Sequence, residues 1–187
     1  MLSLKLMTPP VHEPVTLEEA KAWLKIETAD EDATIARLIA TARQMVEHYT
    51  RRALLAQTWR LMLDRPQAVP FVLLPKAPTL KIVAAFMQGG DGLTTALDLS
   101  GIGLDADSDP QRLILRPLCL NALQATSAVG FDIVFGYGEE SSSVPEALRQ
   151  AVLVLVAQGY EQRAVVDMQA ANPVLPLLAP YVLRRLS

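Results

Sequence analysis

Three alternating aspartates are the residues whose spacing is best suited to chemistry. Asp105, Asp107 and Asp109 match the beginning of a calcium-binding loop. An EF-hand loop also requires glycine at its sixth position and glutamate at its twelfth. Pro110 and Arg116 occupy those positions in this sequence. The pattern therefore favours a solvated acidic loop, and we expect no metal ion to bind there.

Histidine and cysteine side chains offer no second site. His12 and His48 are the only histidines, and neither has a His, Cys or carboxylate neighbour at ligand spacing. Cys119 is the only cysteine, so the chain has no internal disulfide and no standard cysteine-based zinc set. A Cys–His nucleophile would require the fold to bring one of the histidines to Cys119.

The glycine patterns do not match a nucleotide-binding loop. Gly-x-Gly pairs occur at 101–103 and 136–138, but neither opens a helix after a strand in a βαβ unit. The sequence also contains no G-x-S-x-G nucleophile elbow and no Walker A loop. We therefore predict that the chain is not an enzyme and carries no cofactor.

Basic residues pair at two points, Arg51-Arg52 and Arg184-Arg185. Such pairs can contact DNA phosphates or an acidic partner. The chain nevertheless has 17 basic and 20 acidic residues and a net charge of −3, whereas nucleic-acid-binding domains carry a basic excess. We therefore expect solvated surface at these pairs rather than DNA recognition.

The apolar content is high for a chain of 187 residues, with 51% hydrophobic side chains and a mean hydropathy of +0.24. The longest apolar run, at 151–157, is far shorter than the roughly 20 residues that a membrane-spanning helix needs. The N-terminus also lacks the apolar stretch of a signal peptide, so we expect a cytosolic origin. We infer that contacts within an oligomer cover the apolar surface.

Both ends of the chain have helical spacing. Thr16 and Glu19 form a capping box, which predicts a helix near 17–26. Apolar residues then recur at helical intervals and predict a second, amphipathic helix over 31–52. After a polar break, residues 145–162 predict a third helix that is apolar on nearly all sides in its middle.

The middle of the chain follows a period of two. The alternation is clearest from Phe131 to Tyr137, and a strong turn signal stands at 89–92. Residues 57–138 therefore predict about six short strands.

These patterns together predict an α+β fold. We expect a helical unit built from the N- and C-terminal helices, residues 1–55 and 139–187, that carries an inserted small antiparallel β unit, residues 56–138. The Pro- and Leu-rich segment 172–186 predicts an extended arm with a short helical turn.

Several blocks of the sequence share their order and spacing with a known family. They read PVTLEEAKAWLK at 14–25, D-x-x-I-x-x-L-I-x-x-A-R-x-x-V-E at 32–47, TRRAL and QTW within 50–59, VPEALRQA at 144–151, GYEQR at 159–163 and LPLLAPY at 175–181. In combination they resemble the helical blocks of phage head–tail connector (adaptor) proteins. The resemblance is closest to the subgroup with a β insertion, which occurs in tailed phages and gene transfer agents.

The resemblance implies a structural subunit of a ring, a dodecamer, that lies beneath the portal, extends the DNA channel and joins the head to the tail. The implied partners are further copies of the chain, the portal protein and a downstream tail or stopper protein. DNA would pass through the channel without specific binding, and no membrane would be involved. The implied location is the head–tail interface of a virion or phage-like particle assembled in the bacterial cytoplasm.

Two contact surfaces are predicted within this resemblance. The C-terminal tail is expected to bind the portal through Leu175, Leu177, Leu178, Pro180, Tyr181, Arg184 and Arg185. Charged residues on the helices are expected to make subunit contacts, through Arg37, Arg43, Glu47, Arg51, Arg149, Glu161 and Arg163.

Two other functions remain open at this point. The β unit could be a non-catalytic binding module for a protein or carbohydrate ligand, although Trp59, Phe86, Phe131 and Phe135 are better explained as sheet core. A hydrolase using the aspartates at 105–109 would need metal ligands that the sequence does not supply. The sequence also leaves open whether the isolated chain is a monomer or a ring, and which face lines the channel.

Overall fold

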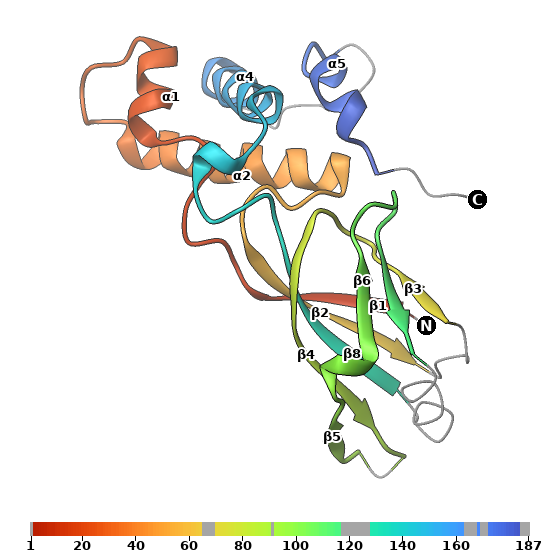
Figure 1. Cartoon of the computed structure of the whole chain (residues 1–187). Coiled ribbons are helices and arrows are strands. Elements are labelled where there is room, and N and C mark those ends of the chain that lie inside the picture. Colours follow the sequence, from red (N-terminus) through yellow and green to blue (C-terminus); the bar gives the residue numbers. More distant parts are fainter. Residues whose placement is uncertain are drawn as a thin grey trace. The chain divides into compact units, whose positions relative to one another are not determined.

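The computed structural model describes residues 2–64, 70–90, 92–116, 128–162, 168 and 172–183. The chain forms two compact units whose segments alternate along the sequence (Figure 1). The β unit comprises the segment up to Pro9 and Ala56–Gly136, and the helical unit comprises Pro10–Leu55 and Tyr137–Leu183. Helices and antiparallel sheets are both present, which confirms the predicted α+β class.

The helical unit contains the three predicted helices and a short fourth one in the tail. They are α1 (Leu17–Leu24), α2 (Asp32–Thr50), α4 (Glu146–Gln162) and α5 (Leu175–Leu178), with 3-10 turns η2 (Ser141–Ser143) and η3 (Ala179–Tyr181).

The capping box at the start of α1 is present as predicted. The Thr16 backbone N–H donates to Glu19 Oε2 at 2.8 Å, and the Glu19 N–H donates to Thr16 Oγ1 at 3.1 Å. The helix ends at Leu24 rather than at 26, because Lys25 adopts a left-handed conformation with φ of 58°. The Ile26 N–H then donates to the Lys21 carbonyl at 3.0 Å, which closes the last turn.

The long helix α2 also ends at a left-handed residue, Arg51, with φ of 58°. The Thr50 hydroxyl donates to the Val46 carbonyl at 2.7 Å and accepts the Arg52 N–H at 3.2 Å. This hydroxyl therefore satisfies backbone groups on both sides of the point where the chain leaves the helix.

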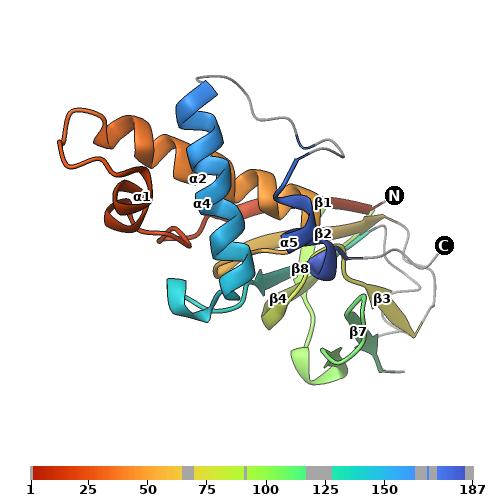
Figure 2. The ribbon, with the colours of Figure 1, turned by 90° about the horizontal axis from the view of Figure 1, so that it is seen from above.

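One apolar core holds the helical unit together. Figure 2 shows α4 lying across α2, and the buried side chains of both helices belong to the same cluster. The central members are Ile35, Ile39, Ala42 and Val46 from α2, and Leu148, Ala151, Val152, Leu155 and Val156 from α4. The sequence predicted burial of this helix on several sides, but the buried residues of α4 recur at intervals of three and four and form one face, while Leu153 and Val154 are only partly buried.

Two antiparallel sheets make up the described part of the β unit. The larger sheet has five strands in the order β1-β2-β8-β4-β5, and the smaller has three in the order β3-β7-β6. The strands are β1 (Leu2–Thr8), β2 (Gln57–Asp64), β3 (Phe71–Leu73), β4 (Thr79–Gln88), β5 (Thr94–Ala96), β6 (Ile102–Asp105), β7 (Arg112–Leu115) and β8 (Ala128–Phe135), and a 3-10 turn, η1 (Leu99–Gly101), precedes β6.

The first strand corrects the predicted boundary between the units. Residues 2–8 were assigned to the helical unit, but they form β1 and pair antiparallel with β2, with Leu4 opposite Leu61. Leucines at every second position, 2, 4 and 6, are a strand pattern that the sequence analysis passed over. The prolines at 9 and 10 then end the strand, since proline cannot donate to a ladder.

Candidate assembly surfaces

The C-terminal tail is docked on the helical unit rather than extended as predicted. Leu178 is fully buried in the helical core, and Leu175, Leu177 and Tyr181 are partly buried against it. The Arg52 Nε donates to the Tyr181 carbonyl at 2.6 Å.

Leu183, the last described residue of the tail, is also hydrogen-bonded to the helical unit. The Leu183 N–H donates to the Thr50 carbonyl at 2.9 Å, at the end of α2. Pro180 is exposed, together with Pro176 and Ala179. Arg184 and Arg185 lie outside the described residues. The leucines of the tail therefore complete the subunit's own core, and its prolines face outward.

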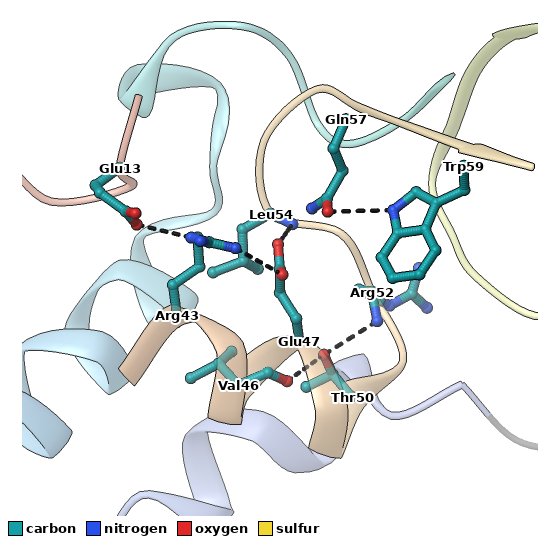
Figure 3. A network of polar contacts seen from close by, with 9 residues as sticks. All are labelled: Glu13, Arg43, Val46, Glu47, Thr50, Arg52, Leu54, Gln57 and Trp59. Carbon is teal, nitrogen blue, oxygen red and sulfur yellow. Dashed lines mark hydrogen bonds and ion pairs between the residues drawn. The ribbon is translucent and has the colours of Figure 1, made fainter. Parts of the chain in front are cut away.

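Arg43 and Glu47 correct the predicted subunit-contact set. Both are buried, with residue exposures of 8% and 6%. The Arg43 Nε donates to Glu13 Oε2 at 2.7 Å and its Nη1 donates to Glu47 Oε2 at 3.0 Å (Figure 3). Glu47 Oε1 accepts the Leu54 backbone N–H at 2.9 Å. These two residues tie the segment before α1 and the turn after α2 to the long helix.

The two neighbouring glutamates favour the charged form of Arg43. Burial alone would lower the pKa of Arg43, but hydrogen bonds and charges from Glu13 and Glu47 outweigh it and raise the pKa. A buried guanidinium is tolerated only when its charge and its N–H groups are compensated, as they are here. The pair therefore fixes the geometry of the helical unit and is not available to a neighbouring subunit.

Arg149 also acts within the subunit. Its Nε donates to the Pro14 carbonyl at 3.0 Å, its Nη1 donates to Glu146 at 2.9 Å, and its Nη2 donates to Glu19. The side chain therefore links α4 to the start of α1. The Glu19 carboxylate accepts a hydrogen bond from the Thr16 backbone N–H and also contacts Arg149. Both interactions lower the pKa of Glu19.

The remaining predicted contact residues are at the surface. Arg37, Arg51 and Glu161 are exposed, so they can contact another chain. Arg163 lies outside the described residues. Of the predicted charged set, the exposed members are thus the ones that remain candidates for a subunit interface.

The aspartate cluster has no calcium geometry. Asp105 on β6 accepts the Arg112 Nε from the neighbouring β7 at 2.7 Å, and this hydrogen bond lowers the pKa of Asp105. Asp107 and Asp109 are exposed. Among the residues that the structure describes, no group of three or more His, Cys, Asp or Glu side chains could hold a metal ion.

A depression on the helical unit has a volume of about 350 Å³. Its lining includes His12, Glu13 and Glu140 beside apolar residues of α1 and α2. Glu13 forms an ion pair with Arg43, and its side chain is 33% exposed, so it faces partly inward.

The aromatic residues of the β unit are divided between core and surface. Phe131 and Phe135 are fully buried, as predicted for sheet core. Trp59 and Phe86 are half-buried, and cationic groups cover their rings: Lys76 Nζ lies 4.7 Å from the Trp59 ring and the Arg60 guanidinium lies 4.9 Å from the Phe86 ring. Rings stacked in this way by the chain's own cations do not form an open carbohydrate platform.

Exposed apolar side chains on strand edges are the surface that the sequence analysis missed. Leu2, Leu6 and Met7 are exposed on β1, and Leu80 and Val83 are exposed on β4. The alternation of leucines at 2, 4 and 6 was the signal that could have revealed the first group. Among the described helices, none combines the length and the apolar character needed to cross a bilayer.

Comparisons with known proteins agree with the resemblance seen in the sequence. Residues 14–85 match the model of the family described as phage gp6-like head-tail connector protein. No curated protein matches the chain at a significant level.

Solved structures match over nearly the whole chain. A chain from the neck of an empty GTA particle computed with C6 symmetry is 26% identical, with a TM-score of 0.80 over 99% of this chain and 97% of that one. A chain from the virion of a native gene transfer agent particle is 26% identical, with a TM-score of 0.78 over 98% and 97%. A chain from the neck of a native GTA particle computed with C12 symmetry is 25% identical, with a TM-score of 0.71 over 97% and 98%.

These matches confirm the resemblance to head–tail connector proteins and the α+β fold with its β insertion. They support a structural connector role, since the matched family is described as a head-tail connector and the matched chains come from the necks of particles.

Proposed function

We propose that the chain is the subunit of a ring that connects the head of a phage-like particle to its tail. The observation that carries the proposal is the similarity to GTA neck chains over 97–99% of this chain. The family match covers α1, α2 and the strands after them as far as residue 85, and it supports the same role. A connector role needs no catalytic group, which agrees with the paired and surface-exposed carboxylates described above.

The ring is proposed to be a dodecamer. Support comes from the C12 symmetry with which the neck of the native GTA particle was computed. A ring subunit must bury apolar surface against its neighbours, and the exposed apolar side chains of the β unit supply such surface. Arg37, Arg51 and Glu161 remain as proposed charged contacts between subunits.

The ring is proposed to dock beneath the portal protein and to contact a downstream tail or stopper protein. On the tail, the proposed portal contacts are now the exposed Pro180 together with Arg184 and Arg185. Leu178 is excluded from this set because it is buried in the helical core. Leu175, Leu177 and Tyr181 are partly buried against the core, so they can contact the portal only through the exposed parts of their side chains.

The channel of the ring is proposed to let DNA pass without holding it. A net charge of −3 supports this, because a strongly basic lumen would bind DNA through counterion release. The proposed location is the head–tail interface of a virion or gene transfer agent particle assembled in the bacterial cytoplasm.

The test is the mass of the purified chain, measured by light scattering alone and with the portal protein of the same particle. The proposal expects either a ring or a monomer that adds to the portal in matching stoichiometry. Charge reversal of Arg184 and Arg185 to glutamate should weaken docking, whereas Asp107→Asn on the exposed acidic loop should not. A strict monomer that does not associate with the portal would overturn the proposed function.

A further inference from the structure

The smaller sheet of the β unit is apolar on both of its faces. On the inner face, Val72 of β3 and Leu113 of β7 are buried, with exposures of 8% and 0%. On the outer face, Phe71, Leu73 and Ile114 are 42%, 46% and 42% exposed. An antiparallel sheet with one solvated face normally alternates apolar residues inward with polar residues outward. The outer face of this sheet therefore has the composition of a covered surface.

The three outward side chains lie next to one another. Phe71 is directly opposite Ile114 in the ladder between β3 and β7, and Leu73 lies on the same face two positions after Phe71. On its other side, Ile114 is opposite Gly103 of β6, which has no side chain to cover it. Phe71, Leu73 and Ile114 therefore form one exposed apolar surface, which we call the outer patch.

Two arginines border the outer patch. Arg112 is opposite Leu73, and its guanidinium lies 5.6 Å from the centre of the Phe71 ring. Its charge is compensated by Asp105, at 2.7 Å. Arg116 is exposed, and its side chain has no ion-pair partner among the described residues. An apolar centre with a polar rim is the usual composition of a protein interface, and here the rim has a net positive charge.

The hairpin of β4 and β5 carries a second exposed surface, at the lower end of the larger sheet in Figure 1. All residues of the segment 92–100 are exposed except Leu97, and Leu93 beside the turn is 70% exposed. The Gly89 N–H donates to the Leu93 carbonyl at 2.9 Å, and the Leu97 N–H donates to the Ala85 carbonyl at 2.8 Å. The backbone of this segment, which we call the hairpin arm, is therefore fixed although its side chains are exposed.

The hairpin arm complements the outer patch in apolar character and in charge. Its exposed large apolar side chains are Leu93 and Leu99. Its one charged residue is Asp98, which is exposed, whereas the rim of the outer patch is positive. Contact between the two surfaces would remove apolar side chains from water and place opposite charges near each other.

We propose that the hairpin arm of one copy packs on the outer patch of the next copy, with Leu93 against the apolar centre and Asp98 towards the arginine rim. The partner is a second copy of this chain, and the proposal rests on the ring assembly proposed above. Because the arm and the patch are different surfaces, the contact is head-to-tail and can repeat around an axis until a ring closes. The competing arrangement, patch against patch, closes after two subunits and leaves the arm uncovered.

Disulfide crosslinking between two single-cysteine chains tests the contact. Both chains carry Cys119→Ser, which removes the natural thiol. The arm chain also carries Leu93→Cys, and the patch chain carries Ile114→Cys. In the matched control the patch chain is replaced by one with Leu2→Cys on β1, where the exposure of 46% is close to the 42% of Ile114. The mixtures are assembled, oxidised mildly and separated by electrophoresis without reducing agent.

The mixture of arm and patch chains should give crosslinked dimers when the ring forms. The control mixture should give at least about tenfold less, because a disulfide requires the two Cα atoms to approach within about 7 Å. Neither the arm chain nor the patch chain should crosslink alone. Crosslinking of the patch chain with itself would overturn the inference in favour of the two-fold contact. Equal yields from the two mixtures, or no crosslink in an assembled ring, would also overturn it.

Charge substitutions give a second measurement. Leu93→Lys and Ile114→Glu each add the sign of charge that the opposing surface already carries. Each should raise the concentration needed for ring formation at least about tenfold, whereas Leu2→Lys should not. Sedimentation velocity measures assembly, and circular dichroism shows that each variant is folded. Normal assembly of both variants would overturn the inference.

The two charge substitutions combined in one chain bring opposite charges together at the proposed contact. The double variant should therefore assemble better than the sum of the two single losses predicts, because residues in contact do not act additively. A loss equal to that sum would overturn the contact between Leu93 and Ile114.

The outcomes separate this inference from the proposed function. If the unmodified chain assembles on the portal and both charge variants do so equally well, the connector role stands and the arm contact is wrong. If the unmodified chain assembles only on the portal, the crosslinking and the charge variants are compared there. An unmodified chain that remains a monomer in both conditions overturns both proposals.

Discussion

The two units of the chain satisfy their polar and apolar groups in different ways. In the helical unit the Arg43–Glu47 pair is buried, with side-chain exposures of 9% and 7%, and it binds two other segments of the same unit. In the β unit the Arg60–Asp132 and Arg112–Asp105 pairs lie nearer the surface, and their arginines are 37% and 42% exposed.

Apolar side chains show the same contrast. Among the exposed large apolar residues of the described chain, only Val11, Trp23 and Tyr49 belong to the helical unit, and the others belong to the β unit. The difference teaches that the helical unit covers nearly all of its large apolar side chains by itself, whereas the β unit leaves many of its own exposed.

This contrast can be measured because each unit contains one of the two tryptophans, Trp23 in the helical unit and Trp59 in the β unit. In a Trp59→Phe background, fluorescence reports unfolding of the helical unit. In a Trp23→Phe background, it reports unfolding of the β unit. The predictions below use these two backgrounds.

The largest effect is expected for Glu47→Ala in the helical unit. The substitution removes the acceptor of the Leu54 N–H and leaves Arg43 buried with part of its charge uncompensated, which should lower the free energy of unfolding by about 3–5 kcal/mol. Urea unfolding followed through Trp23 measures it. Gln44→Ala, on the exposed face of the same helix, should change stability by less than about 0.5 kcal/mol. Equal effects of the two substitutions would show that the Arg43–Glu47 pair does not hold the helical unit together.

A second large effect is expected for Leu178→Ala in the tail. The side chain is fully buried, so its removal should cost the helical unit about 2–5 kcal/mol through lost burial and a cavity. Ala179→Ser, at the exposed neighbouring position, is the control. If Leu178→Ala leaves the Trp23 transition unchanged, the tail is not part of the helical core, and the original idea of an extended arm returns.

An intermediate effect is expected for Gly130→Ala in the β unit. A Cβ atom at this position of β8 would overlap the Phe86 ring and lie 2.7 Å from Met62 Sδ. Overpacking of this kind should lower the stability reported by Trp59 by about 1–3 kcal/mol. Gly103→Ala should not, because its Cβ would lie at an ordinary 3.6 Å from Ile114 Cβ. A destabilisation seen through Trp23 and not through Trp59 would contradict the division into units.

The smallest effect concerns the pH dependence of the helical unit. The hydrogen bond from the Thr16 N–H, with the contact from Arg149, lowers the pKa of Glu19 in the folded chain. The resulting stability is therefore fully present above the ordinary glutamate value of about 4.3 and is lost as the pH falls through the lowered folded-state pKa.

Glu19→Gln is the matched variant, because glutamine also completes a capping box but does not titrate. Between neutral and acidic pH, the free energy of unfolding measured through Trp23 should therefore fall less for Glu19→Gln than for the unmodified chain. An unchanged curve would show that Glu19 does not contribute to the acid sensitivity of the helical unit.

Features that depend on neighbouring residues were predictable from the sequence. The capping box at Thr16 and the apolar spacing of α2 lie within a few residues of one another, so they locate the helices to within about two positions. The helix ends were less predictable, because Lys25 and Arg51 adopt left-handed conformations that glycine or asparagine would normally signal.

Features that depend on distant residues were not predictable. Arg43 looks like a surface residue until Glu13, 30 positions earlier, is placed beside it. Residues 2–8 were assigned to the helical unit, because their partner strand at 57–64 lies about fifty residues later in the sequence. The tail leucines were predicted to bind the portal, but Leu178 is buried in the chain's own helical core, among residues that lie far from it in the sequence.

The alternation of the two units along the sequence also affects how the chain emerges from the ribosome. β1 is synthesised first, but its partner β2 follows only after α1 and α2. The apolar face of α2 must likewise wait for α4, which is made about a hundred residues later. Neither unit can complete its fold until the second half of the chain has been translated. Apolar side chains that are later buried therefore stay exposed to solvent during most of the synthesis. Shielding by a chaperone during translation is therefore expected to raise the yield of soluble subunits more than for a chain whose units follow one another in sequence.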